Sequence, residues 1–243
     1  MSDTLASPSA APAALDDILT VQGLDAGYGR SQVLRDVSFT VPRRGAVAVL
    51  GRNGAGKTTL LRSVMGFTNV RGEIRFDGQD ISGLTPAKRP ALGIGYAPED
   101  RRLFSAFTVE ENILLPAQVA KLDAGETQKR LDRVYHILPE LREMAKRPAG
   151  NVSGGQGKMV ALGRALMLGT KLIILDEPFQ GLAPALAKCY ADALRDLRDT
   201  DRNVSLIITE SNPALLRGFA SKTFVIERAA VAEGSLEDNK ETA

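Results

Sequence analysis

Two patterns of hydrophobic and polar residues take turns along this chain, one typical of strands and one typical of helices, as in α/β proteins. Continuous apolar runs occupy residues 46–50 and 172–175, as expected for strands covered on both faces. Val37, Phe39 and Val41 instead alternate with polar residues, which is typical of a half-buried strand. We therefore expect an early half-buried strand and a mainly parallel core sheet.

The other strand and helix signals continue this rhythm. Residues 18–24 precede the alternating strand, residues 72–78 end in an Asp-Gly turn, and residues 93–97 end at Pro98. The C-terminal third predicts four further elements: a helix over about 184–197, a strand over 204–209, a helix after Pro213, and a hairpin of 223–226 with 230–231. With 243 residues, one domain with a subdomain fits this order best.

The periodicity becomes helical between residue 108 and about residue 147. Thr108 and Glu111 have the residue types and the spacing of a capping box, which begins a helix. Farther along, one helical face collects four apolar residues: Leu131, Val134, Tyr135 and Leu138. These signals predict a helical subdomain over about 100–165, inserted into a domain that spans 18–237.

Composition favours a globular protein without a membrane span. Hydrophobic residues make up 44% and charged residues 25%, and no apolar run approaches the roughly 18 residues that cross a bilayer. Residues 1–17 are rich in Ala, Ser and Pro and lack the basic start and apolar core of a secretory signal. We expect a disordered tail there and a short C-terminal tail over 238–243.

The charged residues give no sign of a nucleic-acid partner. The net charge is only +2, from 31 basic and 29 acidic residues, and basic clusters such as Lys129-Arg130 are interleaved with acids such as Asp132. This mixture is typical of solvated helix faces, so no nucleic acid is expected to bind. Cys189 is the only cysteine, which excludes an internal disulfide and favours an incidental thiol on a helix.

The most informative motif is Gly51-Arg-Asn-Gly-Ala-Gly-Lys57-Thr58, whose spacing fits the phosphate-binding pattern G-x-x-x-x-G-K-[S/T]. An apolar run precedes it and a helical segment, 57–65, follows. Glycines at 51, 54 and 56 let backbone N–H groups curl round a phosphate chain, and the helix dipole favours the same anion. We expect Lys57 to reach the β and γ phosphates and Thr58 to face Mg²⁺.

A second nucleotide motif ends the apolar run 172–175. Asp176 stands where a phosphate-loop ATPase needs a carboxylate facing bound Mg²⁺, at the C-terminal end of a strand. Glu177 would point to the opposite side of the extended chain, where it can polarise the water that attacks the γ phosphate. An acidic pair at a strand end is common, but together with the phosphate loop it predicts ATP hydrolysis.

Ser153-Gly-Gly-Gln156 forms another candidate anion site, at the start of a helix that runs to about residue 168. One nucleotide already has its phosphate loop, so this motif is expected to close over the γ phosphate of a second subunit. Ser-Gly-Gly alone is more often an ordinary helix cap. Its position 23 residues before Asp176 makes the motif much more specific.

Together these motifs make the chain resemble the ATP-binding subunits of ABC transporters, from about residue 19 to residue 234. The resemblance implies an α/β P-loop NTPase with a mainly parallel core sheet, an N-terminal antiparallel β subdomain and a helical subdomain. It also implies ATP and Mg²⁺ as cofactors and ATP hydrolysis as the activity.

The resemblance also assigns roles residue by residue. Tyr28 matches the aromatic residue that stacks on adenine, and without the family a turn aromatic packed on its own sheet is an equal reading. The other implied nucleotide contacts lie in the phosphate loop, in the first turn after it and in the second anion site: Gly51, Asn53, Gly54, Ala55, Gly56, Lys57, Thr58, Thr59, Ser153, Gly154, Gly155 and Gln156.

Three positions depart from the family pattern. Glu99 replaces a glutamine that contacts Mg²⁺ and links to the transmembrane partner, and a carboxylate there can also ligate the metal. Ser211 stands where a histidine touches the γ phosphate, and its hydroxyl can donate one hydrogen bond but carries no positive charge. Ala183 replaces an aspartate that supports the dimer contact. A normal rate of hydrolysis is therefore in doubt.

The combination of Arg52-Asn53, Gly95-Tyr-Ala-Pro-Glu-Asp-Arg-Arg102 and Gly181-Leu-Ala-Pro184 is most similar to the ATPase subunits of branched-chain amino acid importers. That group implies two permease subunits, a periplasmic solute-binding protein, and a second ATPase that is either a similar chain or another copy. It also implies a peripheral place on the cytoplasmic face of the inner membrane.

Three alternatives remain beside an import motor. A soluble ABC protein of DNA repair or the ribosome would normally carry a long coiled coil, zinc cysteines or a duplicated cassette, which this sequence lacks. A nucleotide-binding regulatory subunit with weak hydrolysis would agree with Ser211. A phosphate-loop kinase would not need Ser153-Gly-Gly-Gln156.

Overall fold

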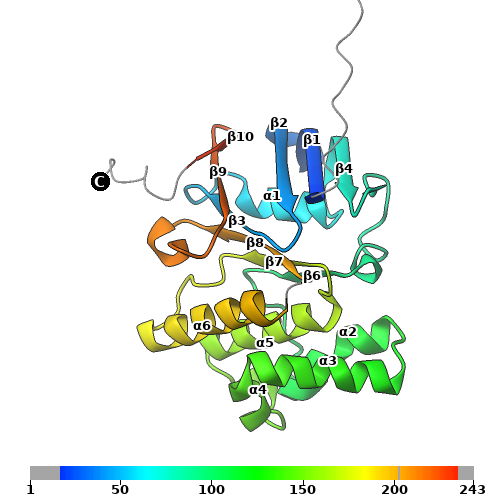
Figure 1. Cartoon of the computed structure of the whole chain (residues 1–243), viewed down its shortest axis with the longest axis vertical. Coiled ribbons are helices and arrows are strands. Elements are labelled where there is room, and N and C mark those ends of the chain that lie inside the picture. Colours follow the sequence, from blue (N-terminus) through cyan, green and yellow to red (C-terminus); the bar gives the residue numbers. More distant parts are fainter. Residues whose placement is uncertain (1–16, 202, 235–243) are drawn as a thin grey trace, which may run out of the picture.

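The computed structural model describes residues 17–201 and 203–234, and two sheets run through this part of the chain (Figure 1). The first sheet is antiparallel, with the order β2-β1-β4-β5. Its strands are β1 (Asp17–Tyr28), β2 (Ser31–Pro42), β4 (Asn69–Phe76) and the two-residue β5 (Gln79–Asp80). This arrangement confirms the predicted N-terminal antiparallel β subdomain.

The second sheet has the order β10-β9-β3-β8-β7-β6, and its strands pair in parallel except for the hairpin of β9 with β10. Its strands are β3 (Ala46–Leu50), β6 (Ile94–Ala97), β7 (Leu172–Asp176), β8 (Ser205–Glu210), β9 (Lys222–Glu227) and β10 (Ala230–Glu233). Strands β3, β7 and β8 are buried throughout, as the continuous apolar runs of β3 and β7 predict for those two strands.

The six-stranded sheet lies between the helices of one side and the antiparallel sheet of the other (Figure 1). It separates two hydrophobic cores. Along β3, Ala46, Ala48 and Leu50 pack with the helical side of the molecule, whereas Val47 and Val49 pack with the antiparallel sheet and helix α1 (Lys57–Val64). This division follows from the two-residue period of a strand, which sends neighbouring side chains to opposite faces.

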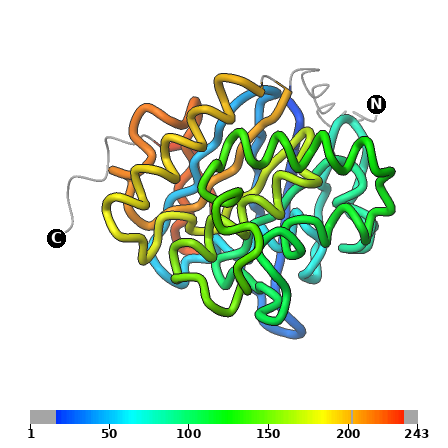
Figure 2. Tube along the Cα trace, turned by 90° about the horizontal axis from the view of Figure 1, so that it is seen from below, coloured from blue at the N-terminus to red at the C-terminus, as the bar shows by residue number. Residues whose placement is uncertain are grey.

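The helical side contains α2 (Val109–Val119), α3 (Ala124–Ile137), α4 (Pro139–Glu143), α5 (Gly154–Leu168) and α6 (Pro184–Thr200). Viewed from this side, the green segments α2, α3 and α4 lie nearest the reader (Figure 2). Thr108 and Glu111 form the predicted capping box, in which Thr108 Oγ1 accepts from Glu111 N at 3.2 Å and Glu111 Oε2 accepts from Thr108 N at 2.7 Å. The four predicted apolar residues of α3 and its C-cap are buried.

The segment after Pro213 is shorter than predicted. It forms one 3₁₀ turn, η3 (Pro213–Leu216), instead of a regular helix. Strand β9 must begin at Lys222, and the chain turns back at Gly218, whose φ of 70° is left-handed, so few residues remain for a helix. Short 3₁₀ turns η1 (Pro90–Leu92) and η2 (Ala149–Asn151) complete the elements of the described ranges.

The predicted tails, 1–17 and 238–243, lie almost entirely outside the described residues; only Asp17 is described, as the first residue of β1. In residues 17–201 and 203–234, no helix combines the length and the apolar character that a membrane crossing requires.

Candidate functional site

Three predicted site segments meet because they follow three neighbouring parallel strands. The register pairs Leu50 of β3 with Glu210 of β8, and Asp176 of β7 with Thr209 of β8. The phosphate loop, the acidic pair and Ser211 therefore leave the sheet at one edge, formed by the C-terminal ends of its strands. This is the edge at which open α/β sheets bind ligands.

The loop before α1 has the backbone expected of a phosphate cradle. Gly54 and Gly56 adopt left-handed φ angles of 80° and 112°, and Gly56 immediately precedes the helix. A Cβ on Gly56 would lie 2.8 Å from Leu34 Cδ2, so a larger residue does not fit against β2. The glycines therefore aim main-chain N–H groups and a helix N-terminus at one place.

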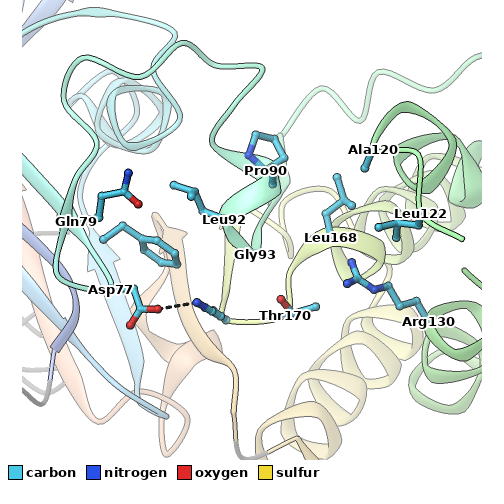
Figure 3. Close-up of a pocket in the computed structure, with 13 residues that line it drawn as sticks. Asp77, Gln79, Pro90, Leu92, Gly93, Ala120, Leu122, Arg130, Leu168 and Thr170 are labelled. Carbon is cyan, nitrogen blue, oxygen red and sulfur yellow. Dashed lines mark hydrogen bonds and ion pairs between the residues drawn. The ribbon is translucent and has the colours of Figure 1, made fainter. Parts of the chain in front are cut away.

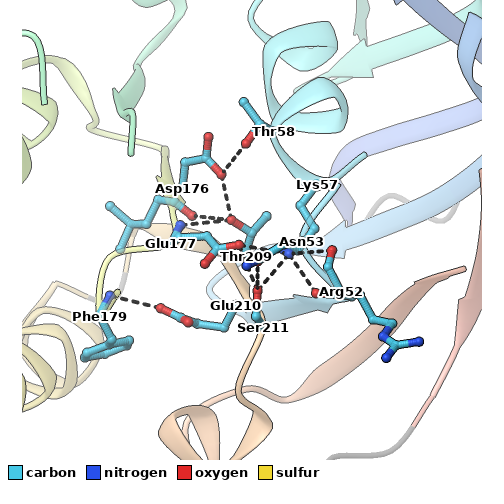
Figure 4. A network of polar contacts seen from close by, with 12 residues as sticks. Arg52, Asn53, Lys57, Thr58, Asp176, Glu177, Phe179, Thr209, Glu210 and Ser211 are labelled. Carbon is cyan, nitrogen blue, oxygen red and sulfur yellow. Dashed lines mark hydrogen bonds and ion pairs between the residues drawn. The ribbon is translucent and has the colours of Figure 1, made fainter. Parts of the chain in front are cut away.

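Lys57 lies at the centre of the polar network drawn in Figure 4. Its Nζ is 2.8 Å from Glu177 Oε1, and both side chains are almost completely buried. The same amine donates to the main-chain oxygens of Gly51 at 2.7 Å and Arg52 at 3.1 Å, and to Ser211 Oγ at 3.0 Å. The loop thus holds a buried cation at its mouth, paired with the predicted catalytic carboxylate.

Ser211 joins the phosphate loop to the acidic strand end. Its Oγ accepts from Lys57 and lies 2.8 Å from Asn53 Oδ1 and 3.0 Å from Glu177 Oε1, either of which can accept its single hydrogen. The structure therefore brings the three predicted catalytic residues, Lys57, Glu177 and Ser211, into direct contact (Figure 4).

Asp176 and Thr58 form a separate oxygen cluster in the same view (Figure 4). Thr58 Oγ1 donates to Asp176 Oδ1 at 3.2 Å, and Thr209 Oγ1 donates to the same atom at 2.9 Å. The Tyr96 hydroxyl lies 3.4 Å from Asp176 Oδ2. Burial raises the pKa of Asp176, and the Thr209 and Thr58 hydroxyls oppose that effect.

This oxygen cluster suits a hard cation whose other ligands come from elsewhere. Mg²⁺ prefers oxygen and is usually held by one or two carboxylates together with substrate phosphates and water. Within the described ranges, no group of three or more His, Cys, Asp or Glu side chains is arranged to hold a metal alone. Thr58 and Asp176 therefore fit Mg²⁺ that arrives with a nucleotide.

Glu99 lies outside this cluster, in the loop that follows β6. Its side chain is exposed, and none of the hydrogen bonds or ion pairs of the described residues involves its carboxylate. Its charge acts on Lys158 of α5, where it partly opposes the lowering of the lysine pKa by burial. The structure does not bring Glu99 together with Thr58 and Asp176 in a hydrogen bond.

Tyr28 ends β1 at a pocket of about 280 Å³. Arg62, Phe67 and Tyr96 line the same pocket, and Tyr28 is 41% exposed, so its ring is free to contact a ligand. The Tyr28 hydroxyl raises the pKa of the Arg62 guanidinium, which burial lowers. The placement agrees with an aromatic contact for a nucleotide base.

Ser153 and Gln156 begin α5 as a capping box. Ser153 Oγ accepts from Gln156 N at 3.2 Å, and Gln156 Oε1 accepts from Ser153 N at 3.0 Å. A Cβ on Gly155 would lie 2.1 Å from Leu186 Cδ2 of α6, so a larger residue here would force the Leu186 side chain to move. In the described chain, no hydrogen bond connects residues 153–156 to the phosphate loop.

The sequence reasoning overlooked Thr209, Glu210 and Lys158. Thr209 Oγ1 accepts from Glu177 N at 3.0 Å, and Glu210 Oε1 accepts from Phe179 N at 2.9 Å. Burial raises the pKa of Glu210 to about 7, and the neighbouring Glu177 adds to this rise. A sequence signal for Thr209 and Glu210 did exist. They stand at the end of a buried strand, and that strand lies beside the one that ends at Asp176.

A cavity of about 500 Å³ lies elsewhere, beside the start of β6 and β7 (Figure 3). Lys171 forms a 2.6 Å ion pair with Asp77 at one side, and Arg130 and Leu122 border the other. None of the predicted nucleotide contacts lines this cavity, so the candidate site and the cavity are separate.

Comparison with protein families identifies residues 34–180 as an ABC transporter domain. The chain is 37% identical over 205 residues to the high-affinity branched-chain amino acid transport ATP-binding protein BraG of Pseudomonas aeruginosa, covering 84% of this chain and 86% of BraG. It is 35% identical to the probable branched-chain amino acid transport ATP-binding protein LivF of Archaeoglobus fulgidus, covering 86% of this chain and 88% of LivF. It is also 35% identical to the lipopolysaccharide export system ATP-binding protein LptB of Haemophilus influenzae, covering 80% of each.

Solved structures of ATP-binding cassettes also resemble this chain. An ATP-binding cassette of an ABC transporter superimposes with a TM-score of 0.78 at 27% identity, covering 90% of this chain and 91% of that one. A structure of such a cassette in its ADP conformation has a TM-score of 0.74 at 27% identity and the same coverage. The relatives therefore agree on a nucleotide-binding transporter subunit and differ in what is transported.

Proposed function

Because this chain belongs to the ABC transporter family, as an ATP-binding and ATP-hydrolysing transporter subunit, we propose that it powers the import of branched-chain amino acids or a related small solute. It works on the cytoplasmic face of the membrane, beneath transmembrane permease subunits. Residues 18–237 form the ATPase domain, and the helical subdomain, about 100–165, together with the Glu99 loop contacts the permeases. A separate periplasmic protein delivers the solute.

The observation that carries this proposal is the contact of Lys57, Glu177 and Ser211 at the edge of the parallel sheet. The loop of Gly51, Asn53, Gly54, Ala55 and Gly56, with Thr59, surrounds the phosphates, and Tyr28 stacks on the adenine. Thr58 and Asp176 would hold Mg²⁺, which would neutralise phosphate charge when bound. Glu99 lies outside this cluster and would reach the metal only through water.

The buried ion pair has a direct consequence for catalysis. Without phosphate, the Lys57 amine is neutralised by Glu177 at 2.8 Å. A bound triphosphate offers Lys57 stronger acceptors, so the amine turns to the phosphate and leaves the carboxylate free. Glu177 then accepts a proton from the attacking water, and the Ser211 hydroxyl donates a hydrogen bond to the γ phosphate.

Ser153 to Gln156 act on a second subunit, which is either another copy or a similar ATPase. Their exposed helix N-terminus closes over the partner's γ phosphate, so that two ATP molecules lie between two subunits. Hydrolysis reopens the pair, and this motion rocks the permeases. Ala183 contributes a smaller contact to the closed pair than an aspartate would.

The two branched-chain amino acid relatives support import, and the Arg52-Asn53 and Gly-Leu-Ala-Pro segments support the same group. Purification of membranes through a tag on this chain tests the proposal. We expect permease subunits to co-purify and the ATPase rate of the reconstituted complex to rise with a branched-chain amino acid and its binding protein. Recovery of the chain without any membrane subunit would contradict a transport role.

A further inference from the structure

Lys158 connects helix α5 to the loop that follows β7. It lies one turn after the Ser153–Gln156 capping box, and its half-buried side chain crosses to the acidic strand end. Lys158 Nζ donates to the main-chain oxygen of Glu177 at 2.5 Å. The contact joins the helix that begins with the second anion motif to the chain's own predicted catalytic residue.

The backbone of Glu177 needs such support. Its φ of 45° is left-handed, a conformation that residues other than glycine seldom adopt. The N–H of Glu177 donates to Thr209 Oγ1 at 3.0 Å, and its carbonyl accepts from Lys158 Nζ and, at the longer distance of 3.3 Å, from Gln180 N. With both polar groups of the residue's backbone held, the carboxylate lies 2.8 Å from Lys57 Nζ.

Acidic residues act electrostatically on Lys158. Burial is the largest influence and lowers the pKa of its amine below the ordinary value, and the charges of Glu210, Glu99 and Glu177 partly oppose this effect, in that order. Arg101 acts in the same direction as burial. The amine that holds the Glu177 carbonyl is thus kept charged partly by acidic residues at or after the ends of β6, β7 and β8.

We infer that Lys158 is a positioning residue for hydrolysis, which fixes the Glu177 peptide so that the carboxylate faces the γ phosphate. This inference rests on the proposed role of Glu177. It also gives a physical link between the two half-sites of one chain, since a movement of α5 against the partner's phosphate pulls on Glu177 through Lys158.

Basal ATP hydrolysis by the full chain tests this role without permeases or solute. Lys158→Met removes the donor and the charge, and Lys158→Arg retains both. We expect Lys158→Met to lower kcat by about tenfold or more and to leave KM for ATP within about twofold, because misplaced catalytic groups affect the chemical step. Lys158→Arg should restore most of the rate.

Arg130→Met is the matched control, since Arg130 Nη1 donates to the Met167 oxygen at 2.8 Å, at the other end of α5. It loses a similar contact between a cation and a carbonyl, and kcat should not change. The inference would be overturned if Lys158→Met hydrolysed ATP at the wild-type rate. It would also be overturned if Arg130→Met lost as much kcat as Lys158→Met.

The Glu177→Gln background separates this inference from the proposed function. If Lys158 acts through Glu177, adding Lys158→Met to Glu177→Gln should lower kcat no further. An additive loss would contradict the positioning role. Normal hydrolysis in Glu177→Gln alone would instead contradict the proposed role of Glu177, on which the inference depends.

Discussion

The centre of the site contains a lysine and a carboxylate that are both buried and only 2.8 Å apart. Each charge is costly to bury alone, so each stabilises the other. The proposed catalytic carboxylate is thus in contact with the proposed phosphate-binding amine. In the proposed mechanism, binding of phosphate by Lys57 and release of the Glu177 carboxylate are one event.

In the proposed site, Ser211 sets the strength of one γ-phosphate contact. Its hydroxyl carries no charge, whereas a histidine can donate a charge-assisted hydrogen bond. We expect Ser211→His to raise the rate of ATP hydrolysis by about tenfold, measured as phosphate release at saturating MgATP. Ser211→Ala serves as the control for loss of the hydroxyl. An unchanged rate in Ser211→His would argue against a weakened site.

Glu210 makes stability depend on pH. Its pKa is raised from the ordinary 4.5 to about 7, chiefly by burial. Between these values the folded chain keeps a proton that the unfolded chain has lost, so the contribution of Glu210 to stability is lost as the pH rises. The slope is at most about 1.4 kcal/mol for each pH unit.

Urea unfolding at pH 5, 6, 7 and 8 measures this slope. In Glu210→Gln the amide oxygen can still accept from Phe179 N, but the titrating proton is gone. We expect the free energy of unfolding to fall less steeply with pH in Glu210→Gln than in the wild type. Parallel curves for the two proteins would contradict a raised pKa for Glu210.

Helices α2 and α5 have the same kind of N-terminus, although they lie in different parts of the fold. Thr108 with Glu111 and Ser153 with Gln156 each form a capping box. Thr108→Ala and Ser153→Ala should each lower the free energy of unfolding by about 1 kcal/mol, since each removes one cap.

Only Ser153 belongs to the proposed interface with the second subunit. Ser153→Ala should therefore also lower ATP hydrolysis, whereas Thr108→Ala should leave it unchanged. Thermal unfolding and phosphate release, measured on both variants, separate the two effects. Equal hydrolysis in both variants would mean that Ser153 is a cap and nothing more.

Local patterns predicted most elements because they depend on local physics. The continuous apolar runs at β3 and β7, and the residue types of the Thr108 capping box, are set within a few residues. The split of the helical region was less visible, because the capped start at Asp123 and Pro139 at the start of α4 divide one periodic stretch. The turn after Pro213 depends on where β9 must begin.

In the candidate site too, the sequence predicted residues in local patterns but not contacts between distant segments. The motif spacing singled out Lys57, Asp176 and Glu177 as candidates, since each lies in a recognisable local pattern. Contacts such as Lys158 with Glu177 and Glu210 with Phe179 join segments far apart in sequence. They follow from the packing of α5 and β8 against the β7 end, which no local pattern encodes.

At the scale of the whole molecule, the sheet divides two cores and the site opens along one of its edges. The phosphate loop extends from the side of α1, and the Ser153 motif begins α5 on the helical side (Figure 1). The two proposed half-sites of one chain share no hydrogen bond in the described residues. The proposed function therefore requires a second subunit to bring a phosphate loop and a Ser153-type motif to one nucleotide.

In the proposed function, two subunits enclose ATP, and Glu177 activates the water that cleaves it. The most direct measurement is the mass, by light scattering, of Glu177→Gln in saturating MgATP, alone and with any second ATPase that co-purifies with it. Since ATP binds but is not cleaved, the account predicts a stable two-subunit mass that Lys57→Ala in the same chain abolishes. A single-chain mass under both conditions, with ATP bound, would contradict it.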